Sequence, residues 1–300
     1  MLTHLKHKVI KRIEKIPLLQ IFIYNNLNYF KFLFPHDKDY YALKLLFKKN
    51  ETRAFADVGG NIGLSTIGFR ELDFKKNRIF IFEPDKNLIK IYLKKIKKNY
   101  SNLKIYPFGL SNKNYSAKLY KAYYKNILFH FNNSFSKKYI KQKLLDNYGT
   151  ESKKFKIRSL KLNLKKFDSL NIDEEICFIK IDVEGLDHLV VQGMKNYIKK
   201  FLPIMLIEYN QSNFIPIYEF LKKKYNCYFY DFSKNKLIKI LNSELLNLKK
   251  GKILENIYKK NSVNIFFIKK SLNINWYYYS YYMYPFIMQN NLNRIYFRFI

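Results

Sequence analysis

The 300 residues suffice for one elaborated domain or two small ones, and an apolar fraction of 48% is normal for a globular protein with a sizeable core. The formal net charge of +33 has two explanations. It indicates an anionic partner, such as nucleic acid, a phosphorylated substrate or an acidic membrane surface, or it reflects the AT-rich codons that Lys, Asn, Ile, Tyr and Phe share. Two distant cysteines argue against a disulfide framework and a paired zinc motif, and no apolar run reaches the roughly 18 residues of a membrane span.

Residues 1–50 are predicted to form an N-terminal helical appendage. Apolar residues recur there at helical spacing, at Leu2, Leu5, Val9, Ile13 and Ile16. Lysines lie between them, so the helix either packs on the main domain with its lysines in water, which we favour, or lies on an anionic membrane. We expect a cytoplasmic protein. If the helix lies on a membrane instead, we expect peripheral contact at the inner face of that membrane.

The segment 51–270 is predicted to be one α/β domain in which strands and helices alternate. Apolar runs predict strands at 54–58, 78–82, 103–108, 176–182, 203–209, 227–232 and 263–268. Amphipathic segments predict helices at 61–73, 85–99, 186–201 and 214–225. This alternation is typical of a Rossmann-like, doubly wound, mostly parallel sheet with helices on both faces.

Two segments depart from this alternation. Residues 111–175 are predicted to be an insertion, with extra strands at 117–122 and 155–162 around a Lys-rich helix. Residues 271–300 form an aromatic C-terminal tail, which we expect to act as a flap over the domain or a dimer contact rather than a membrane-surface anchor. The oligomeric state stays open.

The most informative motif follows the first predicted strand and reads Asp57-Val58-Gly59-Gly60-Asn61-Ile62-Gly63. Glycines allow a ligand to approach the backbone, and the N–H groups at a helix start hold anionic groups. A dinucleotide-binding loop requires G-x-G-x-x-G, and neither register of this loop supplies it, which disfavours a dehydrogenase. The spacing D-x-G-x-x-x-G instead resembles the first motif of S-adenosylmethionine methyltransferases. Asn61 replaces the usual middle glycine there, and Asn tolerates left-handed backbone.

Acidic residues end four predicted strands, at Asp57, Glu83, Asp182 and Glu208. Ligands of open α/β sheets bind beyond the carboxyl ends of the strands, so these acids are predicted to share one rim. A carboxylate about twenty residues after the glycine loop, as at Glu83, can accept both ribose hydroxyls of a nucleoside. Asp85 is instead predicted to cap the following helix.

Five motifs resemble, in order and approximate spacing, the FkbM-type S-adenosylmethionine-dependent methyltransferase family over residues 54–210. They are the loop from Asp57 to Gly63, Phe82-Glu83-Pro84-Asp85, Gly109-Leu110-Ser111, Ile179-Lys180-Ile181-Asp182-Val183-Glu184-Gly185 and Pro203-Ile204-Met205-Leu206-Ile207-Glu208. The resemblance implies a class I methyltransferase fold and O-methylation, commonly of sugar or polyketide hydroxyls. Transferred to this chain, it implies a cofactor site made of Asp57, Gly59, Gly60, Asn61, Gly63, Glu83 and Ser111.

The catalytic candidates are Asp182, Glu184 and Glu208. A hydroxyl acceptor is a weak nucleophile that benefits from a base within hydrogen-bond reach, and Asp182 is the first candidate for that base. These acids, with His188, could also hold a hard divalent ion, but no spacing here is specific for a metal, so we predict no metal site. The acceptor is expected to be a hydroxyl-bearing small molecule, a glycan or glycan precursor of polysaccharide biosynthesis, following the habit of the family.

Two alternatives of other classes remain at the level of the sequence. The net charge favours an RNA or other nucleic-acid methyltransferase or binder. Enzymes that methylate base amines typically carry Asn/Asp-Pro-Pro-aromatic after the fourth strand, where this chain has Asp182-Val183-Glu184-Gly185, and those carboxylates would repel phosphates. The basic N-terminus and aromatic tail leave a non-catalytic interaction or membrane-surface protein as the second alternative.

Overall fold

The computed structural model describes residues 35–125, 127–241 and 264–272, together with the single positions 19, 22, 26 and 245. The predicted amphipathic helix near the N-terminus and the aromatic tail from 273 onward lie outside the described residues. The end of the predicted appendage is described, and it packs into the domain. It forms a 3-10 turn η2 (Lys38–Ala42) and a short helix α3 (Leu43–Leu46).

The central sheet has eight strands in the order β11-β10-β12-β9-β8-β1-β2-β3. The strands are β1 (Ala54–Val58), β2 (Ile79–Phe82), β3 (Leu103–Tyr106), β8 (Ile176–Ile181), β9 (Ile204–Glu208), β10 (Tyr225–Asp231), β11 (Lys236–Lys239) and β12 (Asn264–Lys269). All neighbours from β3 to β9 pair in parallel, whereas β12 runs antiparallel between β9 and β10. The predicted Rossmann-like, mostly parallel sheet is confirmed. β11, which pairs antiparallel with β10, has no counterpart among the predicted strands.

Helices cover both faces of this sheet, as a doubly wound fold requires. One face carries α4 (Leu64–Glu71) and a continuous helical run of α5 (Lys86–Leu88), a π turn η3 (Ile89–Leu93) and α6 (Lys94–Asn99). The other face carries α8 (Asp187–Gly193), α9 (Lys195–Phe201) and α10 (Gln211–Leu221). The helix predicted at 186–201 is two helices that meet at Met194. None of the described helices has the length and hydropathy needed to cross a bilayer.

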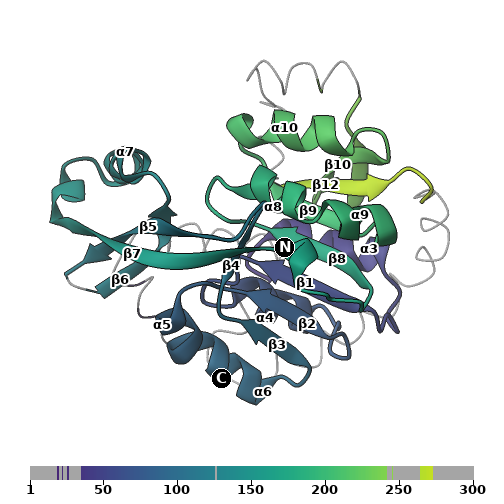
Figure 1. The fold of residues 1–300 in the computed structure, drawn as a ribbon, viewed down its shortest axis with the longest axis horizontal. Coiled ribbons are helices and arrows are strands. Elements are labelled where there is room, and N and C mark those ends of the chain that lie inside the picture. The colour runs from purple at the N-terminus through teal and green to yellow at the C-terminus, as the bar shows by residue number, and fades with distance from the viewer. Residues whose placement is uncertain are drawn as a thin grey trace, which may run out of the picture.

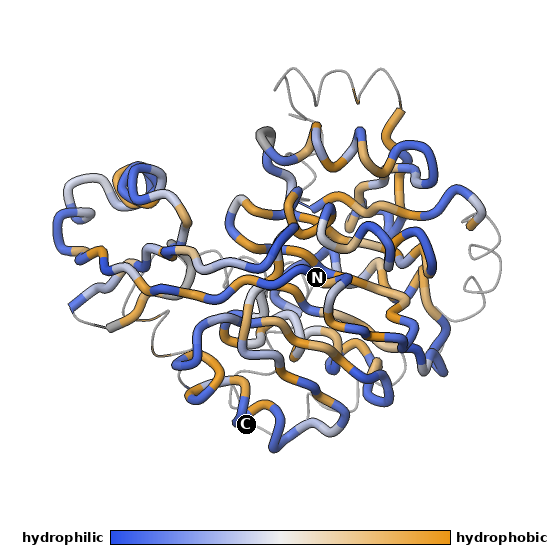
Figure 2. The backbone as a smooth tube through the Cα atoms, in the orientation of Figure 1, coloured by the Kyte–Doolittle hydropathy of each residue, from blue (hydrophilic) through white to orange (hydrophobic). Residues whose placement is uncertain are grey.

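The strand order reverses between β1 and β8, because the chain leaves β1 toward β2 on one side and returns to β8 on the other. Every residue of β1, β2 and β8 is buried. Strands covered on both faces carry continuous apolar runs, and Figure 2 shows these runs in the central sheet. The carboxyl ends of β1, β2 and β8 therefore meet at the reversal point, where open α/β sheets bind their ligands.

The predicted insertion forms a second sheet of order β4-β7-β5-β6. Its elements are β4 (Gly109–Ser111), β5 (Tyr115–Tyr124), β6 (Ile127–Ser134), helix α7 (Lys137–Tyr148), 3-10 turn η4 (Gly149–Lys154), β7 (Phe155–Lys166) and 3-10 turn η5 (Phe167–Ser169). We call β5, β6, α7, η4 and β7 the arm, which projects from the central sheet in Figure 1. The arm has an apolar cluster of its own, which includes Phe129, Ile140 and Leu144.

Candidate active site

The loop after β1 turns sharply at three positions with positive φ. Gly59 has φ +89°, Asn61 has φ +47° and Gly63 has φ +86°. The left-handed conformation expected of Asn61 is therefore present. The N–H groups of Gly59 and Gly60 donate to the carbonyl of Phe82 at 3.0 and 3.1 Å, so the loop is fixed to the end of β2.

Gly59 and Gly60 are small because the neighbouring strands leave no room for a side chain. A Cβ atom on Gly59 would lie 1.9 Å from the backbone oxygen of Asp182, and one on Gly60 would lie 2.4 Å from the side chain of Ile81. The loop thus packs directly on the ends of β8 and β2. The missing side chains leave its backbone as part of the wall of the adjacent pocket.

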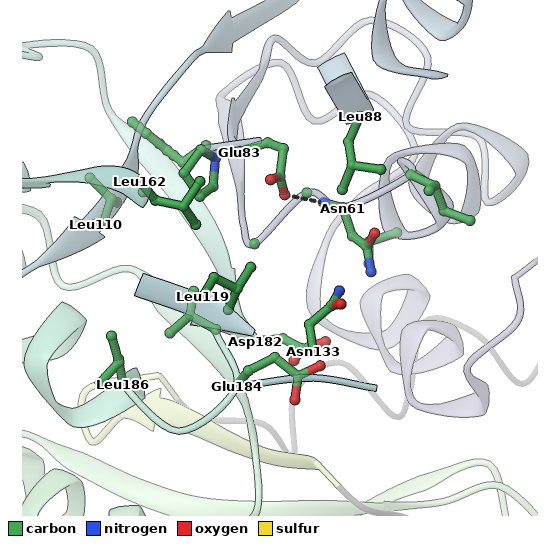
Figure 3. A pocket seen from close by; sticks show the side chains of 18 of the residues that line it. Asn61, Glu83, Leu88, Leu110, Leu119, Asn133, Leu162, Asp182, Glu184 and Leu186 are labelled. Carbon is green, nitrogen blue, oxygen red and sulfur yellow. Dashed lines mark hydrogen bonds between the residues drawn. The ribbon is translucent and has the colours of Figure 1, made fainter. Parts of the chain in front are cut away.

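Glu83 lies against this loop, next to Asn61 (Figure 3). Its Oε2 accepts the N–H of Asn61 at 2.7 Å, and its Oε1 accepts the N–H of Asp85 at 2.8 Å. Burial raises the pKa of Glu83 to about 7, although both hydrogen bonds oppose that rise. Asp85 caps the helix as predicted, because its side chain accepts the N–H of Asn87 at 2.8 Å.

Asp57 lies beneath the loop rather than in the pocket. Its side chain is fully buried, accepts a hydrogen bond from the Thr66 hydroxyl at 3.0 Å, and lies 3.9 Å from the Lys180 ammonium. Gly63, where a Cβ would lie 2.3 Å from Ile96, and the fully buried Ser111 are also outside the pocket wall. These three predicted cofactor residues can therefore act only by shaping the loop and the sheet edge behind the pocket.

Asp182 follows β8 and lines the pocket together with Lys180. The Lys180 Nζ lies 3.0 Å from Asp182 Oδ2. Burial favours the neutral acid, but the Lys180 ammonium outweighs it and lowers the pKa of Asp182 below its ordinary value. Asp182 is consequently a carboxylate at neutral pH. Sequence reasoning missed Lys180 as a functional residue, although a lone lysine inside an otherwise apolar, buried strand was the available signal.

Glu184 also lines the pocket and differs from Asp182 in its charge state. Its backbone has φ +56°, and its Oε2 lies 3.8 Å from the Lys143 Nζ of α7. Burial raises the pKa of Glu184 to about 8, and Lys143 only partly opposes that rise. At neutral pH Glu184 is therefore largely protonated and can donate a hydrogen bond, which ionised Asp182 cannot.

The remaining candidates lie off the pocket wall. Glu208 is exposed at the end of β9, and His188 shares a 2.7 Å hydrogen bond between its Nδ1 and Asn213 Oδ1. Among the residues that the structure describes, no three His, Cys, Asp or Glu side chains form a group that could hold a metal ion.

The pocket lies between the glycine loop and the arm and contains about 980 Å³ of empty space, including its mouth. The arm supplies one wall, which sequence reasoning did not foresee: Leu119, Lys121, Asn133, Phe135, Leu162 and Leu164. Figure 3 shows Asn133 on the same side of the pocket as Asp182 and Glu184.

The pocket has two chemically different parts. Around Glu83, the backbone of the glycine loop faces aliphatic side chains such as Pro84, Leu88 and Leu110. A carboxylate beside apolar faces can bind a ligand that joins a diol to a flat, weakly polar ring. Around Asp182 and Glu184, carboxyl groups meet Asn133 and can bind hydroxyl groups.

Comparison with known proteins places the chain in a family. The family model of the methyltransferase FkbM domain matches residues 57–229, more than half of the chain. A solved structure of methyltransferase FkbM from Methylobacillus flagellatus KT aligns with 16% identity and a TM-score of 0.41, covering 60% of this chain but only 40% of that one. A precorrin-6y C5,15-methyltransferase from Geobacter metallireducens GS-15 aligns with 9% identity and a TM-score of 0.36, covering 77% of this chain and 85% of that one. A search of curated proteins finds no match.

Proposed function

The chain belongs to the FkbM methyltransferase family, and we propose that it transfers a methyl group from S-adenosylmethionine to a hydroxyl of a sugar in a glycan or glycan precursor. One observation carries this proposal. The glycine loop and Glu83 are joined by a 2.7 Å hydrogen bond at one end of a pocket, and the ionised Asp182 lies on the wall of the same pocket. A nucleoside-binding end thus adjoins a base.

The residues at the first end fit the cofactor. Glu83 keeps lone pairs for the ribose hydroxyls beyond the two N–H groups it already binds. The space that a Cβ would fill at Gly59 and Gly60 brings bare backbone to the pocket, and Pro84, Leu88 and Leu110 offer apolar faces to a ring. When bound, S-adenosylmethionine supplies an activated methyl group on its sulfonium.

The residues at the other end would prepare the acceptor. Methyl transfer is an in-line displacement, so much of the rate comes from holding the acceptor oxygen in line. Asp182, kept ionised by Lys180, would accept the hydroxyl proton. Glu184, protonated at neutral pH, would donate a hydrogen bond that orients the sugar. The two carboxyl groups therefore have different proposed roles because their surroundings move their pKa values in opposite directions.

Calorimetry tests the cofactor part of the proposal. The full chain is titrated with S-adenosylmethionine, S-adenosylhomocysteine and NAD side by side. We expect the first two to bind and NAD not to bind, because the loop lacks the spacing for a pyrophosphate. No heat from the first two at millimolar concentration would refute the proposal.

Turnover of an Asp182→Asn variant tests the base. With sugar acceptors and radiolabelled methyl donor, we expect kcat to fall by about 10²–10⁴-fold while cofactor affinity stays as in the wild type. Asp173→Asn is the matched control, because the side chain of Asp173 is 91% exposed and far from the pocket wall. Near-normal turnover of Asp182→Asn would remove Asp182 as the base.

The nucleic-acid alternative makes an opposite prediction for the acceptor. Around the proposed acceptor position the pocket wall carries the ionised Asp182, the protonated Glu184 and Asn133, groups that suit hydroxyls, so the sugar acceptor is preferred. A mobility-shift series with RNA at rising salt separates the two classes, because binding through surface charge alone weakens steeply with salt. Methylation of RNA that persists at physiological salt would favour the alternative.

A further inference from the structure

Lys180 is a buried lysine at the point where β1 and β8 lie side by side. It is 7% exposed, and its Nζ lies 3.0 Å from Asp182 Oδ2 and 3.9 Å from Asp57 Oδ1. Residues two apart in a strand point to the same face, which explains why Lys180 and Asp182 meet at the end of β8. The ammonium group thus lies between the candidate base and the acid beneath the glycine loop.

A buried lysine is stable only when it is paired, and the same holds for a buried carboxylate. Asp57 is fully buried, and the Thr66 hydroxyl binds only one of its two oxygens. Burial alone would lower the pKa of Lys180, but Asp182 and Asp57 hold it well above its ordinary value. The buried Lys180 ammonium therefore depends mainly on Asp182, and Asp57 adds a longer contact from beneath the glycine loop.

We propose that Lys180 is a positioning residue for methyl transfer, whose ammonium group keeps Asp182 ionised at the pocket wall and ties it to Asp57 beneath the glycine loop. This inference rests on the proposed role of Asp182 as the base. Lys180 acts through Asp182, so its loss changes the charge state and position of the base rather than the contacts of the methyl donor.

Other titratable groups also act on this cluster, and they set the background against which Lys180 is measured. The groups that face Asp182 or Lys180 come from the segment before α3, from β1, from α7, from the loop after β8 with the start of α8, and from the end of β9. In chain order they are His36, Asp37, Tyr40, Asp57, Lys143, Glu184, Asp187 and Glu208. Of these groups, only Asp57 pairs with Lys180 as Asp182 does. A Lys180 variant therefore removes the ammonium that links Asp57 to Asp182.

Carboxyl NMR gives a readout that does not depend on turnover. Protein labelled with ¹³C at the aspartate carboxyl carbon is titrated from pH 4 to 9, and the Asp182 signal is assigned by its loss in Asp182→Asn. In the wild type we expect that signal to stay at the ionised position throughout. In Lys180→Met we expect it to titrate within this range, because burial then acts without the ammonium. In Lys180→Arg we expect the wild-type behaviour to return.

Kinetics then connects the titration to the reaction. We expect Lys180→Met to lower kcat at least about tenfold, and to move the acidic limb of the pH profile to higher pH, while the dissociation constant for S-adenosylhomocysteine stays close to that of the wild type. Lys180→Arg should recover most of the rate. Lys104→Met, which removes a lysine on the exposed side of β3, is the control and should match the wild type.

The outcomes separate the two claims. An Asp182 signal that is unchanged in Lys180→Met overturns the positioning role, whatever the turnover. A lower rate with an unshifted pH profile also overturns it, because a purely structural defect predicts that result. Wild-type turnover of Asp182→Asn overturns the proposed base instead, while the titration still reports on the ion pair. If Lys180→Met does not fold, an Asp182 signal that titrates between pH 4 and 9 in Lys180→Arg overturns the proposal.

Discussion

At the scale of single residues, the site depends on Gly59 and on the buried acid Glu83. Gly59 brings the loop backbone against the carbonyl of Asp182, and Glu83 fixes the next turn of the loop through the N–H of Asn61. Both effects are local in geometry but join residues from three strands. Small changes at these positions should therefore alter the pocket before they alter the fold.

Gly59→Ala tests the close approach of the loop to β8. A methyl group there would meet the Asp182 carbonyl at 1.9 Å, at a φ of +89° that disfavours alanine. We expect loss of cofactor binding and a fall in stability larger than backbone strain alone produces, measured by calorimetry and urea unfolding. Gly149→Ala is the matched control, since Gly149 also has positive φ but no atom within 4 Å of a new Cβ. Backbone strain alone costs on the order of 1–3 kcal/mol. Equal effects of the two substitutions would contradict the steric argument.

The raised pKa of Glu83 predicts opposite pH trends for cofactor binding and for folding stability. Its pKa of about 7 means that acid converts it to a carboxylic acid, which is a poorer acceptor for two ribose hydroxyls. Cofactor affinity should fall roughly tenfold per pH unit below about 7. The folding contribution has the other sign: a carboxyl pKa raised by folding stabilises the free protein at low pH, and that stability is lost as pH rises through about 7.

Calorimetry and urea unfolding between pH 5.5 and 8.5 measure both trends. Glu83→Gln removes the titration while keeping an amide of similar shape, so its binding should be weak and flat across this range. A wild-type affinity that does not change with pH would show that ionised Glu83 does not bind the cofactor.

At the scale of elements, two lysine–carboxyl contacts connect the arm to the central domain near both ends of the pocket. Lys121 of β5 pairs with Asp85 at the start of α5, and Lys143 of α7 faces Glu184 after β8. The first pair is almost fully buried, with side chains 2% and 3% exposed. It therefore fixes β5 beside the strand end that carries Glu83.

Removing one partner of the Lys121–Asp85 pair should destabilise the protein more than removing both charges. Lys121→Met leaves a buried carboxylate without its partner, which costs about 3–5 kcal/mol. The double variant Lys121→Met with Asp85→Asn keeps the helix cap, because an amide oxygen can still accept the N–H of Asn87. We expect urea unfolding to show that the double variant recovers most of the lost stability. A double variant no more stable than the single one would contradict this assignment.

At the scale of the whole molecule, the reversal of strand order places the site and the arm encloses it. The central sheet supplies the loop, Glu83 and Asp182, whereas the part of the arm between residues 123 and 156, which we call the outer arm, supplies Asn133, Phe135 and Lys143. The arm also has its own apolar cluster. Under the proposed function, this division predicts that the outer arm helps Asp182 and Glu184 to bind the acceptor, whereas the cofactor needs only the sheet and the base of the arm.

Trimming the arm tests that division of labour. Ala122 and Ile157 are cross-strand partners of β5 and β7, so residues 123–156 can be replaced by an Asn-Gly turn. The shortened protein keeps Leu119, Leu162 and Leu164 on the pocket wall. We expect it to bind S-adenosylhomocysteine as the full chain does and to show an acceptor KM raised at least about tenfold. Urea unfolding checks that the sheet remains folded, and an unchanged acceptor KM would refute the role of the outer arm.

The sequence by itself determined every element of the central sheet except β11, because each of these elements is encoded by neighbouring residues. The apolar run of β1 predicted its limits at Ala54 and Val58, and Asn61 has the left-handed backbone that Asn tolerates. The acid after β2 was predicted to lie on the rim at the strand ends, and there it accepts the N–H of Asn61. β6 was missed because its sequence mixes Asn and His with apolar residues and lacks a clear alternation.

Only the tertiary structure decided which side chains share the pocket. Asp57 and Glu208 lie at the ends of strands, yet neither lies on the pocket wall. Lys121 lies there without any sequence motif, and Lys180 lies there although its motif suggested no role for it. The physical reason is distance along the chain. Lys121 contacts Asp85, which is 36 residues away in the sequence. Lys180 contacts Asp57 from β8, a strand that follows the whole arm in the sequence. Periodicity and turn residues report on neighbours in sequence, but the charges of this site are set by neighbours in space.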